Sequence, residues 1–180
     1  FTTPDNVRAS GLAAAVAAYE SGDADGVLAL VSAHLAAQPE RSDIVHDLLA
    51  HLAEQMMALN KAKRAEMRAF LAWLERAIGA RVDDLSGKTI VHSYLGDYQK
   101  GEPERPFDEL VAVLNKNGHK LTIDIGARAV QERLAGEHQA SLARLLPIKA
   151  RLAATDRLID RLVYRLYGLT AEEIAIVEGA

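Results

Sequence analysis

Hydrophobic residues recur at alternating steps of three and four along two long stretches of the chain, residues 43–78 and residues 127–167. This period is that of one face of an α-helix, so each stretch is predicted to form one long helix. The stripe consists of Leu49, Leu52, Met56, Leu59, Met67, Phe70, Leu74 and Ile78 in the first stretch, and of Leu134, His138, Leu142, Leu145, Ile148, Leu152, Thr155, Ile159, Leu162 and Leu166 in the second. Because about 45 residues separate the two stretches, we predict that they pair as a long antiparallel, coiled-coil-like helical hairpin.

Shorter helices are predicted where a proline or glycine marks a boundary. They cover residues 7–19, 27–38 and 106–114, which are bounded by Pro4, Pro39 and Pro106. After the second long stretch, Gly168 suits a helix end, and Thr170 with Glu173 three residues later forms a capping-box pattern that opens a last short helix. The pattern of the whole chain therefore predicts an all-α fold.

With 180 residues, the chain is predicted to form a single helical domain. The expected parts are an N-terminal helical pair (1–42), a long helix (43–79), a loop-rich insertion with a short helix (80–126), and a long kinked helix followed by a C-terminal short helix (127–178). A kink or break is expected at Pro147, because proline removes a helical hydrogen bond. Residues 121–125 alternate like a strand, which leaves open a strand or an extended loop there.

The composition is that of a globular protein, with 49% hydrophobic residues and no cysteine. The lack of cysteine excludes disulfides and thiolate metal sites and fits a cytoplasmic protein. No apolar run approaches the roughly 20 residues of a membrane span, so no membrane is expected among the partners. The chain begins with Phe1 and has no signal-peptide pattern, which suggests a segment cut from a longer protein.

The net charge of −4 argues against indiscriminate nucleic-acid binding, but the charge is unevenly distributed. Two segments are basic, and they contain Lys61, Lys63, Arg64 and Arg68, and Arg144, Lys149, Arg151, Arg157, Arg161 and Arg165. These side chains are candidates for contacts with DNA phosphates, although solvated helix faces are the commoner explanation of such clusters. Tyr94 and Tyr98, in the polar middle segment, are candidates for stacking on bases or for another surface contact.

No catalytic constellation is present in the sequence. Residues 86–89 read Ser-Gly-Lys-Thr like the end of a phosphate-binding loop, but Val82 occupies the position of the first glycine, which favours an ordinary turn. Asp47, His51 and Glu54 share one helix face and could share a metal ion, although a solvated polar face is the commoner arrangement. His138 is expected to be a core residue that is hydrogen-bonded to a neighbour.

Three blocks of the sequence resemble the C-terminal helical part of large bacterial DNA adenine methylases and of type IIG restriction-modification enzymes. They are residues 45–54 with 70–75, residues 78–79 with 83–89 and 94–98, and residues 145–170. The last block is the most specific, because it ends in Leu-Val-Tyr-Arg-Leu-Tyr-Gly-Leu-Thr.

The resemblance implies a helical accessory or spacer module that assists DNA binding and positions the other domains of a restriction-modification protein. Its partners would be double-stranded DNA and the rest of the parent protein, or a methylase or nuclease subunit. The Asn-Pro-Pro-Tyr motif and the glycine-rich S-adenosylmethionine loop of such methylases do not occur here. The resemblance therefore assigns no catalytic, metal or cofactor-binding residue to this chain, and S-adenosylmethionine would belong to a parent protein.

Two other functions are compatible with the same sequence. The first is a protein-interaction or oligomerisation module without DNA binding, in which the hydrophobic stripes pair with another chain. The second is an autonomous enzyme, which only the face formed by Asp47, His51 and Glu54 would favour.

Overall fold

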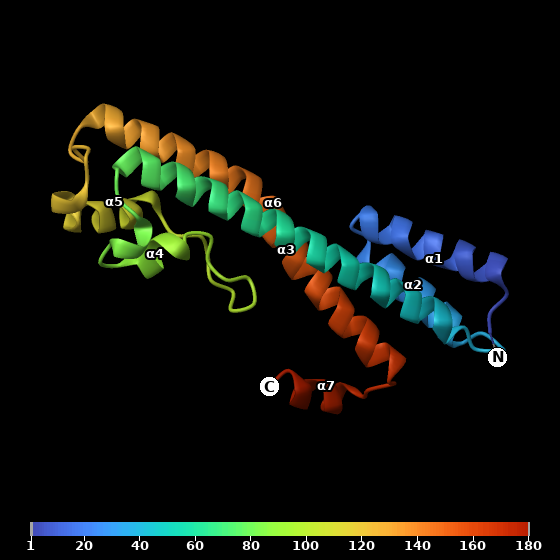
Figure 1. The fold of residues 1–180 in the computed structure, drawn as a ribbon. Coiled ribbons are helices and arrows are strands. Elements are labelled where there is room, and N and C mark those ends of the chain that lie inside the picture. The colour runs from blue at the N-terminus through green and yellow to red at the C-terminus, as the bar shows by residue number, and fades with distance from the viewer. Residues whose placement is uncertain (1, 180) are drawn as a thin grey trace. The chain divides into compact units, whose positions relative to one another are not determined.

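The computed structural model describes residues 2–179 of the chain, and the regular secondary structure of this part is entirely helical (Figure 1). Its elements are α1 (Asp5–Glu20), α2 (Ala24–Leu35), α3 (Ser42–Ile78), η1 (Val82–Asp84), α4 (Lys88–His92), α5 (Phe107–Lys116), η2 (Gly118–Lys120), α6 (Arg128–Leu166) and α7 (Ala171–Val177). The prediction of an all-α fold is confirmed. The two long helices, α3 and α6, coincide closely with the two stretches of helical periodicity.

Local sequence signals explain where several of these helices begin and end. The chain leaves α3 at Gly79, whose φ of 68° lies in the left-handed region that glycine adopts without strain. The capping box at the start of α7 is formed as predicted, with the Thr170 hydroxyl accepting from the Glu173 N–H and the Glu173 carboxylate accepting from the Thr170 N–H. These caps satisfy backbone groups that a helix end leaves without partners.

The chain divides into two compact units. Unit 1 contains the residues up to Met57 and those from Ala154 onward, and unit 2 contains Ala58–Ala153. Both long helices contribute to each unit, since α3 and α6 both cross the division. That the two units fold together as one domain stays a prediction.

The core of unit 1 joins α1 and α2 to the first part of α3 and the last part of α6. Its buried side chains are Ala15, Tyr19, Val27, Leu28, Val31, Val45, Leu48, Leu52, Leu158 and Leu162. Inside this core the hydroxyls of Tyr19 and Thr155 lie 2.9 Å apart and share a hydrogen bond. The predicted packing of the N-terminal helical pair against the ends of the long helices is therefore present within unit 1.

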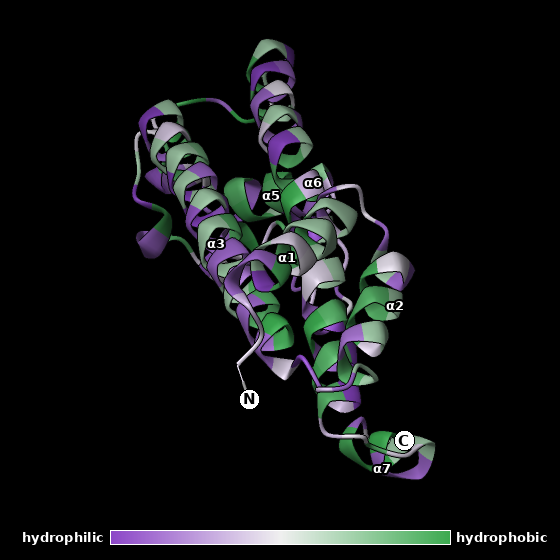
Figure 2. Ribbon diagram, turned by 90° about the vertical axis from the view of Figure 1, so that its right-hand side faces the viewer, coloured by the Kyte–Doolittle hydropathy of each residue, from purple (hydrophilic) through white to green (hydrophobic). Residues whose placement is uncertain are grey.

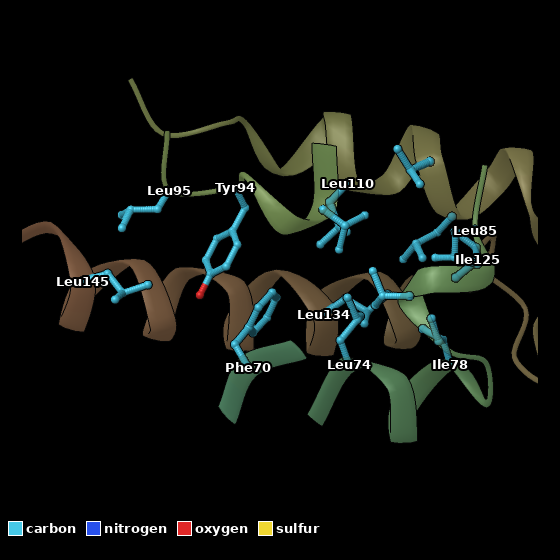
Figure 3. Close-up of a cluster of buried hydrophobic side chains, with 14 residues drawn as sticks. Phe70, Leu74, Ile78, Leu85, Tyr94, Leu95, Leu110, Ile125, Leu134 and Leu145 are labelled. Atoms are coloured by element: carbon cyan, nitrogen blue, oxygen red, sulfur yellow. The ribbon is translucent and has the colours of Figure 1, made fainter. Parts of the chain in front are cut away.

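The core of unit 2 joins the last part of α3 to the first part of α6, and α4 and α5 lie beside them (Figure 3). Phe70, Leu74 and Ile78 of α3 face Leu134 and Leu145 of α6. The insertion contributes Val82, Leu85, Val91, Tyr94, Leu95, Leu110, Val113, Leu114 and Ile125. In both units opposite ends of α3 and α6 are paired, which is the antiparallel order of the predicted hairpin.

The structure decides between alternatives that the sequence left open at residues 121–125 and at Pro147. Residues 121–125 form bends and a turn, so the extended-loop alternative is the one observed in this part of the chain. α6 continues through Pro147 without the break that was one of the two expected outcomes. Pro147 and Ala143, whose carbonyl would accept the missing hydrogen bond, are both exposed, so water can satisfy that carbonyl.

Candidate nucleic-acid interface

The exposed side of α3 in unit 2 carries a stripe of basic side chains. Lys61, Arg64, Arg68 and Arg76, hereafter the basic stripe, follow one another at steps of three, four and eight residues. At 3.6 residues per turn these positions fall within about a third of the helix circumference and extend over about 22 Å. All four residues are exposed, and the buried Phe70, Leu74 and Ile78 occupy the other side of the helix.

The acidic residues on this part of α3 have partners, whereas the basic stripe has none within residues 2–179. Glu66 is paired with Arg144 of α6 at 3.2 Å. Glu75 accepts a hydrogen bond of 2.9 Å from the backbone N–H of Val82. No hydrogen bond or ion pair involves a side chain of the basic stripe in this described part of the chain. The positive charge of this surface is therefore not locally neutralised.

Exposed alanines separate the cations of the basic stripe. Ala62, Ala65, Ala69 and Ala72 all lie on the exposed side of α3. Because alanine projects only a methyl group, a flat or rod-like partner can approach the helix backbone closely. The surface therefore offers charge without bulky apolar side chains.

A groove of about 710 Å³ lies at the end of the basic stripe. It is lined by Ala72, Glu75, Arg76, Gly79, Ala80, Arg81, Asp84 and Lys120. Arg76 and Arg81 were not among the predicted phosphate contacts. Arg76 could have been found from the sequence, because it follows Arg68 by eight residues on the same predicted helix face. Lys120 reaches this groove only because the fold brings it close to Asp84, which lies 36 positions earlier in the sequence. Its ammonium donates to the Asp84 carbonyl at 2.7 Å.

The predicted cation Lys63 and the two predicted tyrosines occupy other environments. Lys63 lies on the inner side of α3, with its ammonium 5.7 Å from the centre of the Tyr98 ring, so both are engaged with each other. Tyr94 is only 2% exposed, and its hydroxyl lies 2.8 Å from that of Ser141. The suggestion that Tyr94 stacks on bases is wrong for this structure, because its ring belongs to the core. Burial raises the pKa of Tyr94 to about 12.

The basic residues predicted on α6 are mostly engaged within their own unit. In unit 2, Arg144 pairs with Glu66, and the Lys149 ammonium donates to the carbonyls of Leu95 and Glu102 at 2.7 and 2.6 Å. In unit 1, Arg161 pairs with Asp25, and Arg165 donates to Ser32 of α2. Arg151 also has an interaction partner, and Arg157 is exposed. These arrangements favour α3 over α6 as the free basic surface.

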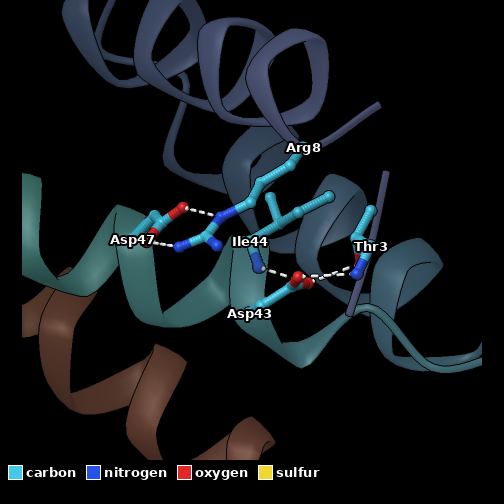
Figure 4. A network of polar contacts seen from close by, with 5 residues as sticks. All are labelled: Thr3, Arg8, Asp43, Ile44 and Asp47. Carbon is cyan, nitrogen blue, oxygen red and sulfur yellow. Dashed lines mark hydrogen bonds and ion pairs between the residues drawn. The ribbon is translucent and has the colours of Figure 1, made fainter. Parts of the chain in front are cut away.

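The suggested metal face of α3 is occupied by other contacts. Both oxygens of Asp47 accept hydrogen bonds from the Arg8 guanidinium, at 2.5 and 2.6 Å (Figure 4). This bond lowers the pKa of the Asp47 carboxyl, while the His51 ring lies edge-on to Tyr19. No group of three His, Asp or Glu side chains suited to a metal ion is found among residues 2–179. The structure therefore does not bring Asp47, His51 and Glu54 together as ligands.

The segment that resembles the end of a phosphate-binding loop is an ordinary turn, as the sequence favoured. Gly87 has a φ of 91° and precedes α4, which begins at Lys88. The Ser86 N–H donates to the Asn117 side chain, and the Lys88 ammonium donates to the Asp83 carbonyl. A backbone cradle for phosphates needs several converging N–H groups, and this turn supplies no such arrangement.

His138 is a core residue, as predicted, but its Nε2 atom has no hydrogen-bond partner within the described residues. The predicted hydrogen bond is therefore not found at this atom. The rings of Phe70, Tyr94 and Phe107 surround the imidazole at centroid distances of 5.9, 5.7 and 5.7 Å. Burial lowers the pKa of His138, because this environment disfavours the charged form.

The comparisons with known proteins identify no relative of this chain. No protein-family model, no curated protein and no solved structure matches the chain. Among residues 2–179, no helix combines the length and the apolar composition that crossing a bilayer requires. The functional assignment therefore depends on the surface of α3 and on the resemblance of the sequence blocks described above.

Proposed function

We propose that this chain is a non-catalytic helical module that binds the phosphate backbone of double-stranded DNA through the basic stripe of α3. In a restriction-modification methylase, the lineage that the closing sequence block resembles, it would assist DNA binding and position neighbouring domains. The observation that carries the proposal is the asymmetry of α3 in unit 2. Lys61, Arg64, Arg68 and Arg76 are exposed without ion-pair partners, whereas Glu66 and Glu75 are both engaged.

The shape and chemistry of the basic stripe favour a polyanion as its partner. Four cations along about 22 Å of one rigid helix match an extended row of phosphates better than a single small anion. The intervening alanines let the helix approach a phosphate backbone closely. Contacts of this kind fix position and orientation without specifying a sequence. Sequence readout is therefore assigned to other parts of a parent protein.

Oligomerisation through the hydrophobic stripes is less well supported. Leu52, Leu74, Leu134 and Leu162, which belong to these stripes, are fully buried within the chain itself. Pairing with another chain would first have to uncover them, which costs about 1.5–3 kcal/mol for each large side chain. The DNA-binding proposal uses side chains that are already exposed.

The experiment is a fluorescence-anisotropy titration of a random-sequence duplex of about 25 base pairs, at about 50 mM salt. The variant K61Q/R64Q/R68Q removes three cations of the basic stripe. Neutralising three phosphate contacts is expected to weaken binding about tenfold or more. Circular dichroism should show an unchanged helical content, because the three side chains are exposed.

A matched control removes the same number of charges from other exposed positions. The variant K100Q/K116Q/R128Q also lowers the net charge by three, but it leaves the basic stripe intact. Its affinity is expected to stay within about threefold of the wild-type value, since it changes only the overall charge. No measurable binding by the wild-type chain, or an equal loss in both variants, would contradict the proposal.

A further inference from the structure

The short helix α7 is well capped but is not covered by the rest of unit 1. Its capping box is complete, yet none of its residues is buried. Ile176 is 77% exposed and Val177 63% exposed, and Tyr167 just before the helix is 73% exposed. Figure 2 shows hydrophobic and hydrophilic residues together on α7. An isolated helix of this length is only marginally stable in water. Covering its exposed apolar side chains with a partner would therefore stabilise it.

The turn between α6 and α7 fixes the direction in which these side chains project. The Gly168 N–H donates to the Arg165 carbonyl at 3.1 Å, and the Leu169 N–H donates to the Tyr164 carbonyl at 2.9 Å. Together with the φ of 64° at Gly168, these bonds form the Schellman arrangement that ends many helices. The turn at Gly168 therefore ends α6 in a defined geometry, from which the chain continues into α7.

Acidic groups without an ion-pair partner among residues 2–179 lie on the Tyr167 side of α6 and directly after Val177. Asp156 and Asp160 are one turn apart on α6, and Tyr164 follows at the next turn on the same side. The pKa of Asp160 is raised, first by burial and then by the negative charges of Asp156 and Glu178. Within residues 2–179, none of these three carboxylates takes part in an ion pair.

We propose that Asp156, Asp160, Glu178, Tyr167, Ile176 and Val177, hereafter the acidic apolar face, bind a basic amphipathic helical segment of a partner protein. Apolar side chains of that segment cover Tyr167, Ile176 and Val177, while its lysines or arginines pair with the carboxylates. Both halves of this recognition follow from unit 1, where the three apolar side chains are exposed and the three carboxylates have no cationic partner among residues 2–179. The proposal is independent of DNA binding, because it concerns the other unit and the opposite charge.

Charge complementarity selects this partner over the alternatives. Nucleic acids and anionic lipid headgroups are repelled by three neighbouring carboxylates. The basic stripe of a second copy supplies cations, but only alanines lie between them, so it leaves the large apolar side chains uncovered. A segment that alternates basic and large apolar residues at helical spacing satisfies both requirements.

The test uses a fluorescently labelled peptide of sequence LKKLLKLLKKLLKL as the probe, with binding to the full chain followed by anisotropy. The variants I176S/V177S and D156N/D160N are each expected to weaken binding about tenfold or more. The first variant removes apolar contact area and the second removes carboxylates. All four residues lie at the surface or near it, and circular dichroism verifies that the helical content is retained.

Matched controls change the same chemistry elsewhere. M57S removes another large apolar side chain, which is 67% exposed, and E40Q/E104Q neutralises two other exposed carboxylates. Both are expected to bind the peptide within about twofold of wild type, since surface changes away from a contact have small effects. A second peptide, QKKQQKQQKKQQKQ, has the same charge without the leucines and is expected to bind at least about tenfold more weakly.

Four outcomes would overturn the proposal. One is the absence of binding, and another is equal binding by the wild type and by both face variants. The third is self-association of the wild type in analytical ultracentrifugation that I176S/V177S abolishes, since a second copy would then cover the acidic apolar face. Equal binding of the two peptides would reduce the interaction to charge alone and would count against the proposal in the same way.

Discussion

The hydroxyls of Tyr94 and Ser141 lie 2.8 Å apart in the core of unit 2, and they are hydrogen-bonded across 47 positions of the sequence. Tyr94 enters the core from the end of α4, and Ser141 lies on α6. This bond satisfies two polar groups that burial would otherwise penalise. It ties the loop-rich insertion to the long helical pair.

Tyr94 and Ser141 are expected to contribute to stability as a coupled pair, because either single change leaves the other hydroxyl buried without its partner. Y94F leaves the Ser141 hydroxyl without its partner and should lower the free energy of unfolding by about 1–2 kcal/mol. In the double variant Y94F/S141A the second change should cost less than S141A alone. Urea unfolding followed by circular dichroism measures all four proteins, with Y167F as an exposed control. Strict additivity of the two changes would show that the bond contributes no coupling energy.

Two glycines are expected to respond to alanine in opposite ways. At Gly79 the backbone has a positive φ, and a Cβ would overlap the Thr122 side chain, so G79A should destabilise by about 1–2 kcal/mol or more. Gly136 lies inside α6 with no atom within 4 Å of an added Cβ, so G136A should stabilise by about 0.5–1 kcal/mol. Thermal unfolding of both variants measures the contrast. A melting temperature for G79A at or above that of G136A would refute it.

Stability is expected to fall below neutral pH because of buried imidazoles. Burial lowers the pKa of His138 and of His34 below the ordinary value of 6.5, so the unfolded chain takes up these protons before the folded one does. Their contribution is fully present above pH 6.5 and is lost as the pH falls from there toward the lowered folded-state pKa.

Unfolding free energies measured between about pH 7.5 and about pH 5 test this dependence. The variant H138L should lose less stability over that range than the wild type, because it has no imidazole to protonate at this position. H119L, which changes an exposed histidine, serves as the control. Identical pH profiles for the wild type and H138L would contradict the assignment to His138. The carboxyls of Asp43 and Asp47 do not interfere, since their lowered pKa values lie below the ordinary 3.8.

The salt dependence of DNA binding gives a count of the phosphate contacts. If all four cations of the basic stripe contact phosphates, the logarithm of the affinity should fall with the logarithm of salt concentration with a slope of about −3.6. The variant K61Q/R64Q/R68Q should reduce that slope by about 2.7. Titrations at several salt concentrations between about 50 and about 200 mM supply both values. An unchanged slope in the variant would place the phosphate contacts elsewhere.

Helix positions were largely predictable from the sequence because their signals are local. The end of α3 follows from Gly79, and the start of α7 follows from the Thr170–Glu173 capping box. The helical period also placed the buried stripes on α3 and α6 correctly. These features depend on residues within a few positions of one another, which a single sequence displays directly.

The engagement of polar side chains could not be predicted in the same way. Arg8 meets Asp47 and Lys149 meets the carbonyls of Leu95 and Glu102 only because the fold brings distant segments together. Tyr94 was suggested as a surface residue because it belongs to the polar middle segment, yet it fills the core beside Phe70, with ring centres 4.8 Å apart. A list of basic residues therefore overestimated the free basic surface. Most of the predicted cations on α6 are engaged, whereas Lys61, Arg64 and Arg68 of α3 and Arg157 of α6 are exposed with no hydrogen bond or ion pair among residues 2–179.

The Lys149 ammonium also has a consequence for the loop that it contacts. It joins the carbonyls of Leu95 and Glu102, and the backbone at Gly96 approaches Pro103 so closely that a Cβ would overlap the Pro103 carbonyl. These contacts hold together the two ends of the loop formed by residues 95–103. They do not involve the tip in the middle of the loop, where Lys100 and Gly101 are exposed. The tip is therefore a natural insertion point, at which an epitope tag or a small reporter could be carried without disturbing the helices on either side.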